Sequence, residues 1–117
     1  MKERQHSADI PIDLLIEKIV GERDDLKEDT FCFELFENAI FNRRKLDELI
    51  ETVVILAEQR KIDGEIKDTL LWITECVDQC FLSHKDSNDY YRIKNYSVSL
   101  ENEWHQQWKK TLMASSL

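Results

Sequence analysis

Two short acidic clusters are the residues whose types and spacing offer the most definite chemistry. The first reads DELIE at residues 47–51 and the second reads EIKD at residues 65–68. Carboxylate oxygens are the hard ligands that Mg²⁺ prefers, and Mg²⁺ bridges such ligands to phosphate groups. The alternative is that both clusters form the solvent-facing sides of two helices. The first interpretation predicts an enzyme, and the second is typical of a binding protein.

The two clusters resemble the motif of the MazG-type all-α nucleotide pyrophosphatases, over residues 46–80. In that family the carboxylates bind magnesium, which positions a nucleoside triphosphate for hydrolysis. The resemblance implies a Mg²⁺ cofactor with the ligands Glu48, Glu51, Glu65 and Asp68. The chain departs from the family pattern at Lys67, where a glycine is common, and at Asp47, where the first cluster otherwise begins with glutamate.

Helix geometry bears on whether these carboxylates can meet. At about 100° per residue, Glu48 and Glu51 lie nearly opposite the apolar face of their segment, and Glu65 and Asp68 lie roughly 140° from theirs. Those faces are formed by Leu46, Ile50, Val53 and Ala57, and by Ile66, Leu70, Ile73 and Val77. If the two faces pack on each other, the acidic pairs point apart. We therefore expect four solvent-facing carboxylates, with no catalytic residue and no cofactor, and keep the magnesium site as the alternative.

Cys76, Cys80 and His84 recur every four residues, which would align them on one helix. Thiolates and imidazoles bind zinc, but a structural zinc site needs four ligands. The chain has three cysteines and no evident fourth partner. We expect free, buried cysteines and no zinc.

The segment YYRIKNY at residues 90–96 alternates aromatic with basic side chains. Such a pattern can stack on and neutralise single-stranded nucleic acid, although a net charge of −8 repels that ligand. We expect the tyrosines to pack partly against the protein with their hydroxyls in water. Tyr90 and Tyr91 are also candidates for a protein-binding patch, because tyrosine is enriched at interface hot spots.

Helices must position these residues, because two glycines and one proline in 117 residues leave few tight turns. Apolar residues at steps of three and four predict a single all-α domain over residues 1–117, a bundle of about five helices. The predicted helical segments are residues 10–21, 24–41, 43–61, 65–81 and 97–117. Pro11 and Gly21 bracket the first of them, as expected for a helix start and end.

Particular residues are expected to fix the remaining helices. Asp25 with Glu28 is a capping pair for the second helix, whose Phe33, Phe36 and Ile40 should lie near the core. Asp63 and Gly64 form a turn. The following helix carries the clearest packing seam of the chain, which comprises Ile66, Leu70, Ile73, Val77 and Cys80. Ser99 is the expected cap of the last helix, whose core stripe comprises Leu100, Trp104, Trp108 and Leu112.

The composition excludes several classes of protein. A hydrophobic content of 42% is too high for a disordered chain, and no apolar run reaches the roughly 18 residues that a membrane span needs. The segment MKERQHSADI lacks the apolar stretch of a secretory signal. We expect a soluble, cytoplasmic protein without a membrane or nucleic-acid partner.

Charge and aromatic residues together indicate a binding protein. Residues 63–89 hold seven acidic and two basic side chains, and Glu65, Asp68 and Glu75 share one helical stripe with Trp72. With Tyr90 and Tyr91 these are the expected partner-binding residues. The predicted function is an acidic inhibitor of a basic partner protein, of the immunity, antitoxin or anti-defence type. The alternatives are the magnesium-dependent pyrophosphatase and a homo-oligomeric scaffold, as small as a homodimer, that uses the Ile66–Cys80 seam between subunits.

Overall fold

A computed structural model describes residues 11–117 of the chain, all of whose regular elements are helices. The segment on which the prediction about a secretory signal depends lies outside the described residues. The elements are α1 (Ile12–Val20) with a 3₁₀ turn η2 (Gly21–Arg23), α2 (Phe31–Glu37), α3 (Arg43–Glu58), α4 (Gly64–Lys85), and a continuous C-terminal helix made of α5 (Val98–Glu103), the π-helical turn η3 (Trp104–Trp108) and α6 (Lys109–Ser115). The prediction of a small all-α bundle is confirmed. None of these helices is long and apolar enough to cross a membrane.

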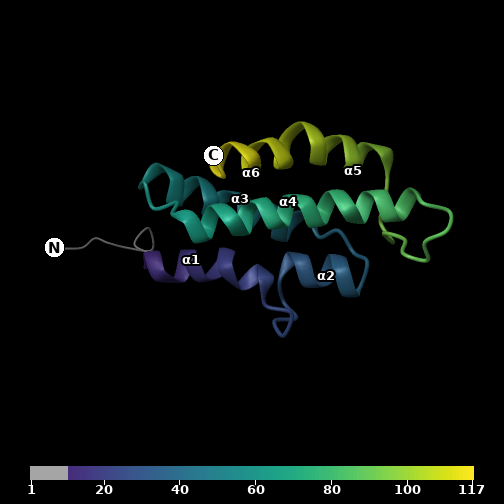
Figure 1. The fold of residues 1–117 in the computed structure, drawn as a ribbon, viewed down its shortest axis with the longest axis horizontal. Coiled ribbons are helices and arrows are strands. Elements are labelled where there is room, and N and C mark those ends of the chain that lie inside the picture. Colours follow the sequence, from purple (N-terminus) through teal and green to yellow (C-terminus); the bar gives the residue numbers. More distant parts are fainter. Residues whose placement is uncertain (1–10) are drawn as a thin grey trace.

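The longest helix, α4, runs through the middle of the molecule (Figure 1). α1 packs against both α3 and α4, and α6 packs against the same two helices from the opposite side. α2 and η2 cover the part of α4 that lies beyond the end of α1. Because α3 and α4 contact α1 and α6 more closely than each other, their apolar faces do not form a shared seam.

The apolar seam predicted for α4 is buried inside the monomer. Ile66, Leu70, Ile73 and Val77 are fully inaccessible, while Cys80 is half-buried and Phe81 takes the last core position. Asp63 accepts the Ile66 N–H and caps α4, so the predicted Asp63–Gly64 turn is the start of the helix. Since α1 and α6 fill this seam, it offers no surface for a second subunit.

The apolar face of α3 is rotated from the predicted one. Leu46 and Val53 are buried as expected, but Leu49 and Leu56 complete the core, Ile50 is half-buried and Ala57 is exposed. The rotation follows from the two neighbours of α3, because α1 and α6 approach it from different sides.

The C-terminal helix keeps its predicted stripe in the core through a local change of pitch. Leu100, Trp104, Trp108 and Leu112 are all buried, although steps of four residues drift by about 40° each in a regular α-helix. The wider π turn at residues 104–108 takes up this drift. The helix begins two residues earlier than expected, since the cap is Ser97, which accepts the Leu100 N–H, and not Ser99.

α2 is shorter than predicted, and its capping pair is wrong. The Asp24 carboxylate accepts the Leu26 N–H, which fixes a turn where the sequence suggests a helix start. Thr30 caps α2 through the Phe33 N–H. The helix therefore buries Phe31, Cys32 and Leu35. Of the residues expected near the core, Phe36 packs against it and is half-buried, Phe33 is half-buried and Ile40 is exposed.

Candidate functional site

The carboxylates of the two acidic clusters are not gathered at one point. Glu48, Glu51, Glu65 and Asp68 are all exposed on α3 and α4, and Glu48 also borders a cleft between α1 and α3. Within residues 11–117, no three His, Cys, Asp or Glu side chains are placed to hold a metal ion. The ligand set implied by the resemblance to the pyrophosphatases therefore does not fit a magnesium site in this arrangement.

Asp47, the first residue of the DELIE cluster, has a packing role instead. Its carboxylate accepts the indole N–H of Trp108 at 2.7 Å, and Asp78 accepts that of Trp104 at 2.9 Å. Both tryptophans are buried, as predicted for residues that cover the core. These carboxylates satisfy donors that burial would otherwise leave without a partner.

Cys76, Cys80 and His84 lie on α4, which extends to Lys85, but each has a different environment. Burial raises the pKa of the Cys80 thiol to about 11, which makes it a poor nucleophile. The His84 Nδ1 atom accepts the Ile93 N–H at 2.9 Å, so this nitrogen is engaged in holding the loop after α4. All three cysteines are free thiols; Cys32 is buried as expected, whereas Cys76 and Cys80 are only half-buried.

The tyrosines of residues 90–96 differ from one another in exposure. The Tyr91 hydroxyl donates to the Leu35 carbonyl and the Tyr96 hydroxyl donates to Glu101, so each has a partner within the protein. Tyr96 also stacks on His84, with ring centroids 4.1 Å apart. Tyr90 is fully exposed. One tyrosine of the three is thus free to contact a partner with its whole ring.

Three of the predicted partner-binding residues do lie together on one exposed side of α4. Glu65, Asp68 and Glu75 are exposed along it. Leu71 and Leu82 lie on the same face and are 41% and 59% exposed, and neither belongs to the predicted partner-binding residues. We call these five residues the outer face of α4. That these residues share one exposed face can be recognised in the sequence only after the buried residues of α4 have been identified.

Trp72 lies at the border of the outer face, half-buried beside α2. Phe36 contacts its ring edge-on, with centroids 5.9 Å apart, and the Arg23 guanidinium lies 5.2 Å from the ring centre. A small pocket of about 80 Å³ opens next to it. We call it the Trp72 pocket; it is lined by Glu22, Arg23, Asp24, Asp25, Phe33, Phe36, Glu37 and Trp72.

The predicted partner-binding residues thus form two groups on one side and one end of the molecule. Glu65 and the end of α4 at Lys85 are separated by about 30 Å along the helix axis, and Tyr90 follows in the loop beyond. A standard protein interface of about 800 Å² per partner can span such a distance. Tyr91 contributes to packing through its bond to Leu35.

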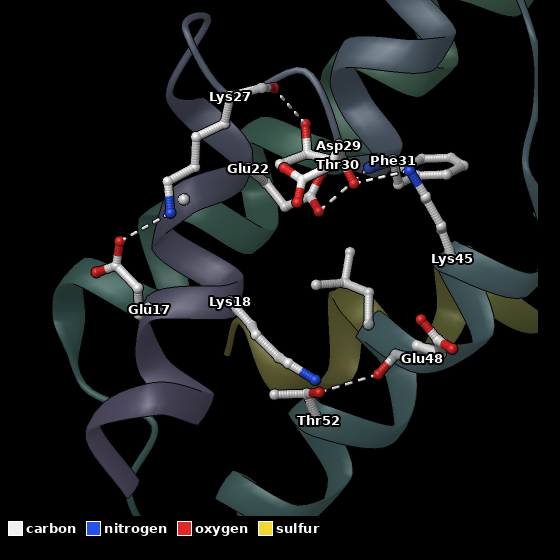
Figure 2. A pocket seen from close by; sticks show the side chains of 12 residues that line it. Glu17, Lys18, Glu22, Lys27, Asp29, Thr30, Phe31, Lys45, Glu48 and Thr52 are labelled. Carbon is white, nitrogen blue, oxygen red and sulfur yellow. Dashed lines mark hydrogen bonds and ion pairs between the residues drawn. The ribbon is translucent and has the colours of Figure 1, made fainter. Parts of the chain in front are cut away.

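A larger cleft of about 270 Å³ lies between α1, the loop before α2 and α3 (Figure 2). Glu22 sits within it with 8% of its surface exposed and accepts the N–H groups of Phe31 and Cys32. Burial raises the pKa of this carboxyl, and those hydrogen bonds oppose the rise. Glu22 thereby caps the start of α2 together with Thr30.

Two of the three lysines that line this cleft are held in ion pairs. Lys27 contacts Glu17 at 3.0 Å, and Lys45 contacts Glu34 at 2.7 Å while donating to the Asp29 carbonyl. Lys18 extends across the cleft toward the side of α3 that carries Glu48 and Thr52 (Figure 2). The cleft thus lies between helices and is lined by both carboxylates and lysines, of which Lys27 and Glu17 pair with each other.

The comparisons with known proteins gave no match: no family model, no curated protein and no solved structure is significantly similar to the chain. The resemblance of residues 46–80 to the pyrophosphatases therefore depends on the two acidic clusters alone.

Proposed function

We propose that this protein is an acidic binding module that docks on a basic partner protein and inhibits it, as immunity, antitoxin and anti-defence proteins do. The observation that carries the proposal is the outer face of α4. It combines three exposed carboxylates with two exposed leucines, and no other helix formed by residues 11–117 covers it. Acidic side chains steer a basic partner toward this face, and the apolar side chains supply contact area after docking.

The charge of the whole molecule supports the same partner chemistry. A net charge of −8 attracts a basic protein over distances of about a Debye length, or roughly 8 Å at physiological salt. An inhibitor benefits from such attraction because rapid association limits the time during which its target is active. The proposed target therefore carries a basic surface at or beside its active site.

The test starts from the partner itself. The protein, immobilised through its C-terminus, is used to recover partners from its producing organism, and each purified partner is then assayed for activity with increasing amounts of the inhibitor. We expect activity to fall to background at one equivalent. A bound protein whose activity is unchanged at excess inhibitor would contradict the proposal.

A second assay distinguishes the pyrophosphatase alternative. The purified protein is incubated with a panel of nucleoside triphosphates and Mg²⁺, and pyrophosphate release is measured for the wild type and for Glu65→Gln. We expect no release above the protein-free control. Magnesium-dependent release that Glu65→Gln abolishes would replace the binding proposal with an enzymatic one.

A further inference from the structure

The Trp72 pocket has the size of a site for one side-chain head group. Its volume is about 80 Å³, whereas pockets for metabolites and drug-sized ligands occupy roughly 300–1,000 Å³. It lies beside the outer face of α4, so a protein docked on that face can reach it with a single side chain. The chemistry of its walls then determines which side chain fits.

Aromatic rings and carboxylates make up those walls. Phe33, Phe36 and Trp72 provide the rings, and Glu22, Asp24, Asp25 and Glu37 provide the carboxylates. Glu22 and Asp24 already accept backbone N–H groups. Among residues 11–117, no ion pair uses Asp25 or Glu37. The pocket therefore offers two exposed carboxylates beside an aromatic surface, a combination that attracts organic cations.

The chain itself places a cation on this surface. The guanidinium carbon of Arg23 lies 5.2 Å from the centre of the Trp72 ring, within the range of a cation–π contact. Arg23 is exposed and takes part in none of the ion pairs formed by residues 11–117. It can leave the ring without breaking such a pair. The guanidinium group of Arg23 thus shows where an organic cation can lie against Trp72, and it occupies this position in the free protein.

We propose that the Trp72 pocket binds the guanidinium group of an arginine from the partner protein, which displaces Arg23 from the face of Trp72. Arginine fits better than lysine because its planar head group stacks on an aromatic ring and presents a fork of donors to carboxylates. Asp25 and Glu37 accept from that fork. This inference rests on the proposed function, since it assigns the arginine to the basic partner.

Nuclear magnetic resonance of the Trp72 indole N–H provides a direct readout. The probes are three blocked tripeptides: tri-arginine, tri-lysine and tri-citrulline, the last being a neutral analogue of arginine. The indoles of Trp104 and Trp108, hydrogen-bonded inside the bundle, are internal references. We expect a saturable shift of the Trp72 signal with tri-arginine, at least threefold weaker binding of tri-lysine, and no shift with tri-citrulline.

Variants separate the pocket from general charge effects. Asp25→Asn/Glu37→Gln keeps the shape of the rim and removes two charges, and the control Glu51→Gln/Glu58→Gln removes two exposed charges from α3. We expect the rim variant to weaken tri-arginine binding at least tenfold and the control less than twofold. Arg23→Ala, which removes the internal competitor, should tighten it at least threefold.

Two results would overturn the inference: equal shifts with tri-arginine and tri-citrulline, or equal losses in the rim variant and the control. The proposed function can be judged separately with the intact partner. If Glu65→Lys/Glu75→Lys weakens partner binding while Asp25→Asn/Glu37→Gln leaves it unchanged, the docking face stands and the arginine site fails. If no partner is inhibited but tri-arginine binds as expected, the pocket stands without the inhibitor role.

Discussion

Two aspartates show how single acidic residues of this chain serve the core. Asp47 on α3 and Asp78 on α4 accept the indole N–H groups of Trp108 and Trp104, which pack between those helices. The tryptophans bury large rings while their one donor each reaches a charged acceptor. A carboxylate that looks like part of a metal motif in the sequence is therefore a structural acceptor.

We predict that Asp47→Ala lowers the free energy of unfolding by about 1–2 kcal/mol, because it leaves the Trp108 N–H without its acceptor. Asp47→Asn retains an acceptor oxygen and should recover at least half of this loss. Urea unfolding followed by circular dichroism measures both. The control is Glu51→Ala, an exposed residue on the same helix, for which a change within about 0.5 kcal/mol is expected. Equal losses for Asp47→Ala and Glu51→Ala would contradict the assigned role.

His84 makes the loop after α4 sensitive to acid. Burial, followed by the nearby Arg92 charge, lowers the pKa of the His84 imidazole, whose Nδ1 must be unprotonated to accept the Ile93 N–H. The unfolded chain takes up the proton at a higher pH than the folded protein does. The stability from this contact is thus complete above the unfolded pKa, about 6.5, and is lost as the pH falls below it.

The variant His84→Asn tests this dependence, because its amide oxygen can accept the same N–H without titrating. We predict that the free energy of unfolding falls more between pH 7.5 and pH 5.5 for the wild type than for His84→Asn. Urea unfolding at the two pH values gives both differences, and the other titrating groups cancel in the comparison. An identical fall in the two proteins would show that His84 does not contribute.

At the scale of elements, local sequence patterns correctly predict those features that depend on a single helix, such as which of its sides is buried. The spacing of Ile66, Leu70, Ile73 and Val77 identifies the buried side of α4 correctly, since one helix face is a local property. The start of α2 is different. It depends on Glu22, whose carboxylate accepts the N–H groups of Phe31 and Cys32, nine and ten residues further along the chain. No local sequence pattern reveals these two hydrogen bonds.

The Trp72 pocket is a second feature that local sequence patterns do not reveal, because it depends on contacts between helices. The acidic stripe and Trp72 are visible on the helical wheel of α4, but Phe33 and Phe36 reach the pocket only because α2 packs on α4. The sequence pattern assigns these two phenylalanines to the core. Phe31, Cys32 and Leu35 occupy the buried side of α2, so Phe33 and Phe36 lie beside that side and are half-buried. Tertiary packing therefore converts a predicted core stripe into a pocket wall.

The start of the C-terminal helix gives an element-scale prediction. Ser97 accepts the Leu100 N–H, whereas Ser99 lies inside the first turn and is exposed. Ser97→Ala should lower the free energy of unfolding by about 1 kcal/mol, the usual loss for an N-cap serine. Ser99→Ala is the matched control, and a change within about 0.5 kcal/mol is expected. A larger loss for Ser99→Ala than for Ser97→Ala, by thermal or urea unfolding, would place the cap at Ser99.

At the scale of the whole molecule, the acidic charge and the uncovered face of α4 lie together. The loop that follows η2 adds Asp24 and Asp25 beside Trp72, so the carboxylates of two elements border one apolar area. The chain's long central helix thus packs its inner side against α1 and α6, while Glu65, Asp68, Leu71, Glu75 and Leu82 on its outer side are exposed. Steering by this face predicts that charge changes act mainly on association and apolar changes mainly on dissociation.

The most direct test of this account is the association rate constant of the recovered partner with three proteins, measured by stopped flow at low and high salt. They are the wild type, Glu65→Lys/Glu75→Lys on the outer face of α4, and Glu51→Lys/Glu58→Lys, which changes the net charge equally on α3. At low salt we predict at least tenfold slower association for the α4 variant and at most threefold slower association for the α3 variant. At high salt the difference between the two variants should be smaller, because screening weakens steering. Equal slowing by both variants, or none by either, would contradict the claim that the outer face of α4 is the docking face.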